Sequence, residues 1–232
     1  NIVNGGTPSR DKRTGVQVTN GTVNMTGGNT FTVWGAKNNG VILDGGTLSM
    51  TKSGTNPNSF GISGSDNNAL LLNGGDFTSD KTEITISGNK NIGINNQGAS
   101  SANISRGFIT LNAGTTNSNA IYTKSNDLNT QLVQFNINGS SSTSEDKNAG
   151  IYAGSGSSKV SDDRSTFAIS GTGNNGIYAA DGDVETSGTT FQVFGHWKNN
   201  GIYAKASGKD VKVTRGSFNI TGTESNGIRA EE

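Results

Sequence analysis

Two short acidic segments are the residues of this sequence best suited to acid–base chemistry. They are Asp162, Asp163 and Arg164, and Asp181, Gly182 and Asp183. A pair of carboxylates can cleave a glycosidic bond when one donates a proton and the other activates water or attacks the sugar. Both segments fall between expected strands, and neither has a partner group at the matching position of a neighbouring repeat. We therefore interpret them as solvated turn residues, with a polysaccharide-active enzyme as the alternative.

His196 is the only histidine, so any Ser-His-Asp triad would have to use it. It stands between Gly195 and Trp197, and no Gly-x-Ser-x-Gly nucleophile turn accompanies it. The sequence has no cysteine, which excludes a Cys/His zinc site, and no Gly-Lys-Ser/Thr phosphate loop. We expect His196 to lie in an exposed loop. We also expect no cofactor, no metal site and no enzyme activity.

The elements that would position these residues come from an internal repeat. The sequence Asn-Gly-Ile-Tyr-Ala occurs at 175–179 and 200–204, Ala-Gly-Ile-Tyr-Ala occurs at 149–153, and looser copies begin at 39, 68, 92, 119 and 226. Its small second residue recurs from position 40 to position 227 over seven intervals, an average of about 27 residues. A period in this range indicates a solenoid or another repeat architecture. A Phe-x-Ile or Phe-x-Val segment, usually closed by glycine, precedes each copy, and a third, fainter strand precedes that segment.

Three columns of this repeat hold only apolar residues. The first is Val41, Leu70, Ile94, Ile121, Ile151, Ile177, Ile202 and Ile228; the second is Phe31, Phe60, Ile84, Ile109, Phe135, Phe167, Phe191 and Phe218; the third is Val33, Ile62, Ile86, Leu111, Ile137, Ile169, Val193 and Ile220. Short strands with period-2 alternation that stack about 4.8 Å apart would merge these columns into one core. The sequence therefore predicts an all-β, right-handed parallel β-helix with three strands per coil and about eight coils. An antiparallel β-sandwich would not explain the uniform columns. Asparagine at the coil corners would form amide ladders and tolerate left-handed backbone.

The same alternation predicts a column of tyrosines on the outside. In Gly-Ile-Tyr-Ala the isoleucine and alanine share the inward face, so the tyrosine must point outward. This column comprises Tyr122, Tyr152, Tyr178, Tyr203 and Arg229, with Lys124 and Lys205 two positions further along their strands. Tyrosine and arginine are enriched at binding hot spots. The column is therefore a candidate partner-binding strip, and a self-stacking ladder that only stabilises the rod is the alternative.

Three more aromatic residues are expected at the surface. Trp34 and Phe194 occupy an outward column in which serine and threonine are usual, and Trp197 lies close to Phe194. The charged run that ends at Arg13 precedes the first clear strand, so we expect residues 1–15 to form an N-terminal cap or tail and residues 16–232 to form one β-helix domain. Scattered exposed aromatics are ordinary, so these three residues alone define no site.

Composition excludes several classes of partner. Lys and Arg number 18, as do Asp and Glu, so the formal charge is zero. A nucleic-acid-binding module normally carries a basic excess, and a membrane-surface protein a polybasic segment. Hydrophobic residues are only 29% and glycine is 35 of 232, numbers that would suit a disordered chain if the apolar residues were not so strictly placed. We expect no nucleic-acid partner and no small-molecule cofactor.

Repeats that end in Asn-Gly-Ile-Tyr-Ala and Phe-x-Ile, in a Ser/Thr/Asn/Gly-rich chain without cysteine, resemble the passenger domains of Gram-negative autotransporters. The resemblance covers about residues 16–230. It implies secretion through the outer membrane to the cell surface or medium, and a precursor with a C-terminal β-barrel translocator. The short length and repeat style are similar to the angiogenic passengers of Bartonella, which implies a virulence ligand for a host endothelial growth-factor receptor.

These observations lead to three hypotheses about function. The first is a secreted, non-enzymatic ligand or adhesin that binds a host cell-surface protein or receptor. The second is a self-associating adhesin or aggregation factor that forms oligomers along the side of the rod. The third is the polysaccharide-active enzyme. The absence of a catalytic cluster favours the first.

Overall fold

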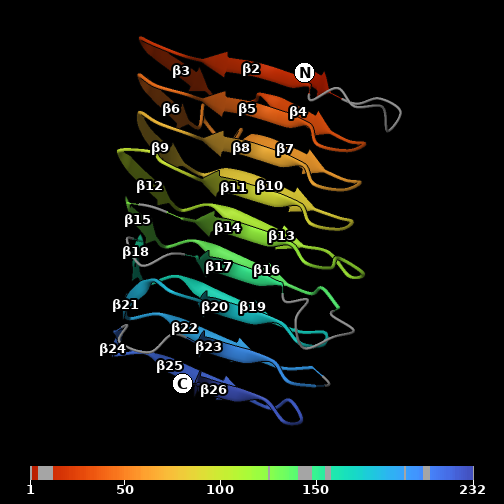
Figure 1. The fold of residues 1–232 in the computed structure, drawn as a ribbon, viewed down its shortest axis with the longest axis vertical. Coiled ribbons are helices and arrows are strands. Elements are labelled where there is room, and N and C mark those ends of the chain that lie inside the picture. Colours follow the sequence, from red (N-terminus) through yellow and green to blue (C-terminus); the bar gives the residue numbers. More distant parts are fainter. Residues whose placement is uncertain are drawn as a thin grey trace.

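The fold is a parallel β-helix of about eight coils (Figure 1). The computed structural model describes residues 2–4, 13–124, 126–140, 148–154, 158–195, 197–205 and 210–231. Each complete coil contributes one strand to each of three sheets, and every strand pairs in parallel with the strands of the neighbouring coils. The stack begins with the N-terminal coil at the top of Figure 1 and ends with the C-terminal coil at the bottom.

We name the three sheets A, B and C. Sheet A contains β1 (Ile2–Asn4), β4 (Thr30–Val33), β7 (Asn58–Ile62), β10 (Thr82–Ile86), β13 (Phe108–Leu111), β16 (Gln134–Ile137), β19 (Thr166–Ile169), β22 (Thr190–Val193) and β25 (Ser217–Ile220). Sheet B contains β2 (Thr14–Val18), β5 (Asn39–Leu43), β8 (Asn68–Leu72), β11 (Ile92–Asn96), β14 (Asn119–Thr123), β17 (Ala149–Ala153), β20 (Asn175–Ala179), β23 (Asn200–Ala204) and β26 (Asn226–Ala230). Sheet C contains β3 (Thr22–Thr26), β6 (Thr47–Thr51), β9 (Asp76–Asp80), β12 (Ser101–Ser105), β15 (Asn126–Gln131), β18 (Ser158–Asp163), β21 (Asp183–Ser187) and β24 (Val211–Thr214).

Strand register confirms the three predicted inward columns. Ile151 pairs with Ile177, Phe135 with Phe167, and neighbouring positions of each column pair in the same way from coil to coil. The aromatic column stacks face to face, with ring centroids 4.4 Å apart for Phe135 and Phe167 and 5.0 Å apart for Phe167 and Phe191. Most of these side chains are fully buried, whereas Ile220 and Ile228 in the last coil are exposed. The core is therefore one continuous apolar interior that runs along the helix axis.

A ladder of asparagines closes the corner between sheets A and B, as the sequence predicts. From β5 onward, the residue just before each strand of sheet B is an asparagine or a serine, at positions 38, 67, 91, 118, 148, 174, 199 and 225. Along most of the ladder a backbone N–H donates to the side-chain oxygen of the next coil, as Asn174 does to Asn199 over 2.9 Å. The Asn174 amide donates in turn to the carbonyl oxygens of Ser170 and Gly139. Buried turn backbone is thus hydrogen-bonded without the help of water.

Asparagine does not supply most of the left-handed backbone, which is a correction to the sequence-based prediction. Among the described residues, eleven non-glycine residues have positive φ, and Asn117 is the only asparagine of the eleven. Lysine and arginine occupy seven of these positions, Arg106 and Arg164 among them. Glycine holds the tightest corner, because a Cβ at Gly64 (φ 92°) would lie 2.1 Å from the carbonyl oxygen of Gly35 in the preceding coil.

The N-terminal residues already belong to the stack. β1 pairs with β4, and β2 begins at Thr14, within the residues assigned to a cap or tail. Arg13 extends this pairing, since its carbonyl oxygen accepts from the backbone N–H of Asn39. The charged residues 10–12 lie outside the described residues.

Candidate functional site

The predicted tyrosine column exists as one outward file on sheet B. Strand pairing places Tyr122, Tyr152, Tyr178 and Tyr203 over one another, and Arg229 follows Tyr203. The rings lie 5.2, 4.8 and 5.0 Å apart between successive centroids. Tyr152, Tyr178 and Tyr203 belong to a small cluster that is separate from the main core. The self-stacking that the sequence left as an alternative is thus present.

The four tyrosines differ in how far they reach solvent. Tyr122 and Tyr152 are half-buried, whereas only 8% of Tyr178 and 2% of Tyr203 are exposed. Burial, followed by the charge of the neighbouring tyrosines, raises the pKa of Tyr152 to about 12. Burial and a hydrogen bond to Glu231 raise the pKa of Tyr203 to about 12. The hydroxyl groups therefore stay protonated at neutral pH and can act as hydrogen-bond donors.

At the C-terminal end of the column, the polar groups form hydrogen bonds and an ion pair within the chain. The hydroxyl of Tyr203 donates to the carboxylate of Glu231, which also forms an ion pair with Arg229. The Arg229 guanidinium lies 5.3 Å from the centre of the Tyr203 ring, within range of a cation–π interaction. Lys124 and Lys205 are exposed. The tyrosines of the strip that a partner can reach are therefore Tyr122 and Tyr152, with Lys124 beside them.

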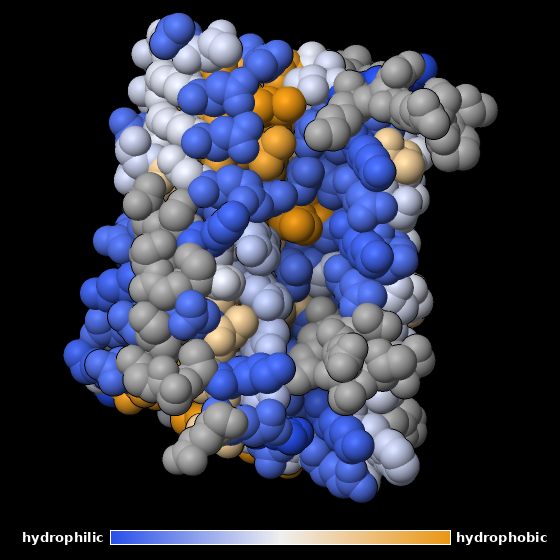
Figure 2. Space-filling view, in the orientation of Figure 1, coloured by the Kyte–Doolittle hydropathy of each residue, from blue (hydrophilic) through white to orange (hydrophobic). Residues whose placement is uncertain are grey.

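The column continues toward the N-terminus with residues that the sequence analysis missed. Register carries the file from Tyr122 through Asn95 to Leu71 and Ile42. Leu71 and Ile42 are half-buried and line a shallow groove of about 380 Å³. Figure 2 shows that hydrophobic side chains reach the surface over these N-terminal coils on a face that is otherwise mostly hydrophilic. The signal was available, because the two residues stand at the same repeat position as the tyrosines.

The other predicted surface aromatics are exposed. Trp34 is 43%, Phe194 41% and Trp197 54% exposed. The ammonium of Lys198 lies 6.0 Å from the centre of the Trp197 ring. His196 lies outside the described residues.

Asp162 is not a solvated turn residue, and this prediction was wrong. It lies in β18, only 3% exposed, and accepts hydrogen bonds from the hydroxyls of Thr130 (2.6 Å) and Thr189 (2.5 Å), and from Ser165. The first two partners lie on the neighbouring coils, where the sequence analysis found none. Burial raises the pKa of the Asp162 carboxyl, although these hydrogen bonds oppose the shift. The side chain fills an inward position of sheet C between Thr130 and Thr186.

The two acidic groups nearest to Asp162 on the outer face are ion-paired. Asp163 accepts a hydrogen bond from Gln131 and pairs with Arg164, and these contacts lower its pKa. Glu185 pairs with Lys212 over 2.7 Å, and this contact lowers its pKa. Both groups are therefore ionised at neutral pH, and neither can serve as the protonated acid of a glycosidase pair. Asp183 is the first residue of β21, and Asp181 is exposed just before this strand.

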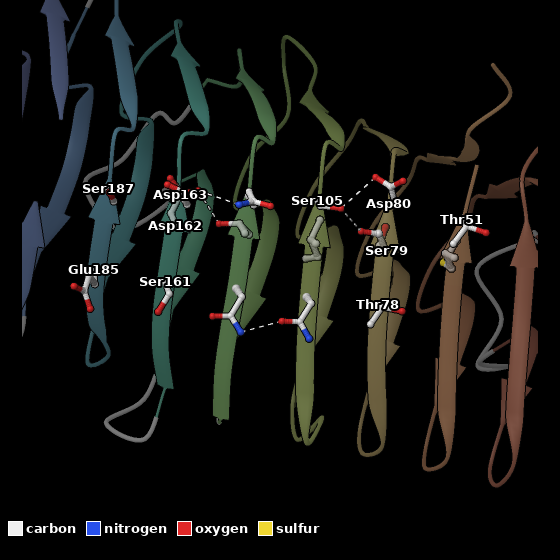
Figure 3. Close-up of a pocket in the computed structure, with 16 residues that line it drawn as sticks. Thr51, Thr78, Ser79, Asp80, Ser105, Ser161, Asp162, Asp163, Glu185 and Ser187 are labelled. Atoms are coloured by element: carbon white, nitrogen blue, oxygen red, sulfur yellow. Dashed lines mark hydrogen bonds between the residues drawn. The ribbon is translucent and has the colours of Figure 1, made fainter. Parts of the chain in front are cut away.

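A groove runs along the outside of sheet C, and the sequence analysis did not anticipate it. It has a volume of about 710 Å³ and crosses six coils, from β6 to β21. Figure 3 shows hydroxyl, amide and carboxylate side chains along it, including Thr78, Ser161 and Glu185. No apolar motif marks these positions, so only the register of the strands could reveal the groove.

Two structural searches of the described residues gave negative results. No group of three or more His, Cys, Asp or Glu side chains is placed to hold a metal ion. No helix there is long and apolar enough to span a bilayer. We found no protein-family model, no curated protein and no solved structure that matches this chain.

Proposed function

We propose that this chain is a non-enzymatic binding module that contacts a host cell-surface protein through the outer face of sheet B. The observation that carries the proposal is the exposed half of the tyrosine column, Tyr122 and Tyr152 with Lys124 beside them. Tyrosine offers a large contact area at a low cost in side-chain entropy, and the paired strands hold both rings in place before binding. The resemblance to autotransporter passengers supports a secreted or surface location, with a translocator barrel in the precursor and an endothelial growth-factor receptor as the partner.

The protonation states and positions of the acidic groups favour a binding protein over a glycosidase. Asp163 and Glu185 on the outer face of sheet C both have a lowered pKa, and the carboxyl with a raised pKa, Asp162, is buried on the inward side. A glycosidase needs one protonated and one ionised carboxyl on the same side of the substrate. We therefore favour the binding module over the polysaccharide-active enzyme.

The test is saturable binding of the purified, labelled chain to intact endothelial cells. Replacing Tyr122 and Tyr152 together by serine should weaken binding about tenfold or more, because each lost hot-spot ring costs about 1–2 kcal/mol. Trypsin treatment of the cells should abolish binding by the unchanged chain, and the growth response of the cells should fall together with binding.

The control is Phe194→Ser, which removes an exposed aromatic ring elsewhere on the surface. It should bind as the unchanged chain does, and circular dichroism should show that all variants are folded at the temperature of the binding assay. Equal binding by the double tyrosine variant and the unchanged chain would contradict the proposal. Sedimentation at two concentrations would reveal the self-association that the second hypothesis requires.

A further inference from the structure

The groove on sheet C has the form of a channel between two outward columns. Its floor is the backbone of β6, β9, β12, β15, β18 and β21, and its length is about five strand spacings, or ~24 Å. One wall is Thr78, Asn103, Asn129, Ser161 and Glu185, and the other is Thr51, Asp80, Ser105, Gln131, Asp163 and Ser187. Figure 3 shows these side chains following the coils one after another. A channel of this shape fits an extended chain better than a compact molecule.

The centre of the walls has hydrogen-bonding capacity that the protein does not use up. Asn129 donates to Asn103 over 3.0 Å, and Gln131 donates to Asp163 over 3.0 Å. A side-chain amide has two N–H donors and an oxygen with two lone pairs, so these contacts leave most of each amide to solvent. Asn103, Asn129 and Gln131 are exposed. The groove thus presents donors and acceptors on both sides of its middle coils.

The three carboxylates in the walls are ion-paired. Asp80 is paired with Arg106 through two hydrogen bonds of 2.8 and 2.6 Å, Asp163 is paired with Arg164, and Glu185 is paired with Lys212. Each carboxylate therefore has a cation at the rim of the groove, and Glu185 has a second one in Lys159. The central wall residues Asn103, Asn129 and Gln131 carry no charge, so a ligand held by them should be polar and uncharged.

The channel cannot take a peptide by strand addition. That mode needs an unpaired strand edge, and the strands of the groove are hydrogen-bonded to neighbours on both sides. A glycan needs no such edge, because vicinal hydroxyls pair with the two ends of an amide or with a carboxylate. The coil repeat of about 4.8 Å is also close to the rise per sugar of an extended pyranose chain.

We propose that the sheet C groove binds an uncharged, extended glycan that lies along the helix axis, with Asn103, Asn129 and Gln131 as its central contacts. This site lies on a different sheet from the tyrosine column, so it goes beyond the proposed function and does not depend on it. Because Asp163 and Glu185 are both ion-paired, the glycan is held and released without cleavage.

The experiment is calorimetric titration of the purified chain with cellohexaose and with chitohexaose, two uncharged and extended hexasaccharides. At least one should bind, and Asn129→Ala with Gln131→Ala should weaken that binding about tenfold or more, since each lost hydrogen bond is worth about 1 kcal/mol. The matched control is Asn136→Ala with Gln192→Ala, the same residue types on the outer face of sheet A. It should leave the affinity unchanged.

Four results would overturn the inference. They are no binding of either hexasaccharide, equal affinity of the groove variant and the unchanged chain, tighter binding of a heparin hexasaccharide than of both neutral ones, and shortened sugars after incubation. Sedimentation that shows self-association lost with the groove variant would assign the face to a second copy of the chain instead. Cell binding through Tyr122 and Tyr152 is measured separately, so either proposal can fail while the other stands.

Discussion

Replacing Phe167 by alanine should lower the free energy of unfolding by about 3–5 kcal/mol, the range for a fully buried aromatic side chain. The ring is completely buried and lies between those of Phe135 and Phe191, with centroid distances of 4.4 and 5.0 Å. The strand pairing of β16, β19 and β22 fixes the coil spacing, so the neighbouring coils cannot close over the cavity. We therefore expect the decrease in the free energy of unfolding to lie in the upper half of this range.

Urea unfolding followed by far-UV circular dichroism measures this change. The matched control is Phe194→Ala, which removes the same side chain where it is 41% exposed. The control should shift the free energy by about 1 kcal/mol or less, because little apolar surface is returned to water. Comparable losses in both variants would mean that Phe167 does not belong to a stacked interior column.

Replacing Asn174 by alanine should lower the free energy of unfolding by about 3 kcal/mol, because three hydrogen bonds worth ~1 kcal/mol each are lost. Its amide donates to Gly139 over 2.6 Å and to Ser170, and its oxygen accepts from Asn148 over 2.9 Å. The site is completely buried, so water cannot replace the lost partners. The loss should appear in the same urea experiment.

The ladder itself provides a graded control for this variant. Serine occupies the same column at Ser118, where its hydroxyl accepts from the backbone N–H of Asn91 and donates to the carbonyl of Thr116. Asn174→Ser should therefore be less destabilising than Asn174→Ala. The opposite order would contradict the hydrogen-bond explanation.

The architecture could be predicted from the sequence because every coil requires the same pattern of apolar positions. Each coil needs an apolar residue at the positions of Ile177 and Phe167, because these positions pair with the same positions of the neighbouring coils. A polar residue at either position would be buried in the core, which costs free energy. Eight consistent copies make the period visible even though each copy is short. The amide ladder followed from the same logic, because an asparagine or serine recurs before every strand of sheet B from β5 onward.

Asp162 could not be predicted correctly from the sequence. Its hydroxyl partners Thr130, Ser165 and Thr189 are spread over three coils of uneven length, and only the strand register brings them together. An aspartate beside Asp163 and Arg164 is typical of a turn. The burial of Tyr178 and Tyr203 was missed for a similar reason, since alternation tells which side of a strand a residue faces and not what covers that side. The sheet C groove depends on side chains whose types vary from coil to coil.

The most direct test of the account is disulfide cross-linking of neighbouring coils, in a chain that has no cysteine of its own. Thr85 and Thr110 are paired residues of β10 and β13, so cysteines there would lie about 4.8 Å apart, within the range that a disulfide spans. The control combines Glu83→Cys with Thr110→Cys, which shifts one partner by two residues to a separation of about 8 Å, beyond that range. Because the coils stack in parallel, we expect rapid cross-linking of the first pair and little of the second under mild oxidation. Equal cross-linking of the two pairs, or a preference for the second, would contradict the stacked parallel coils on which both proposed surfaces depend.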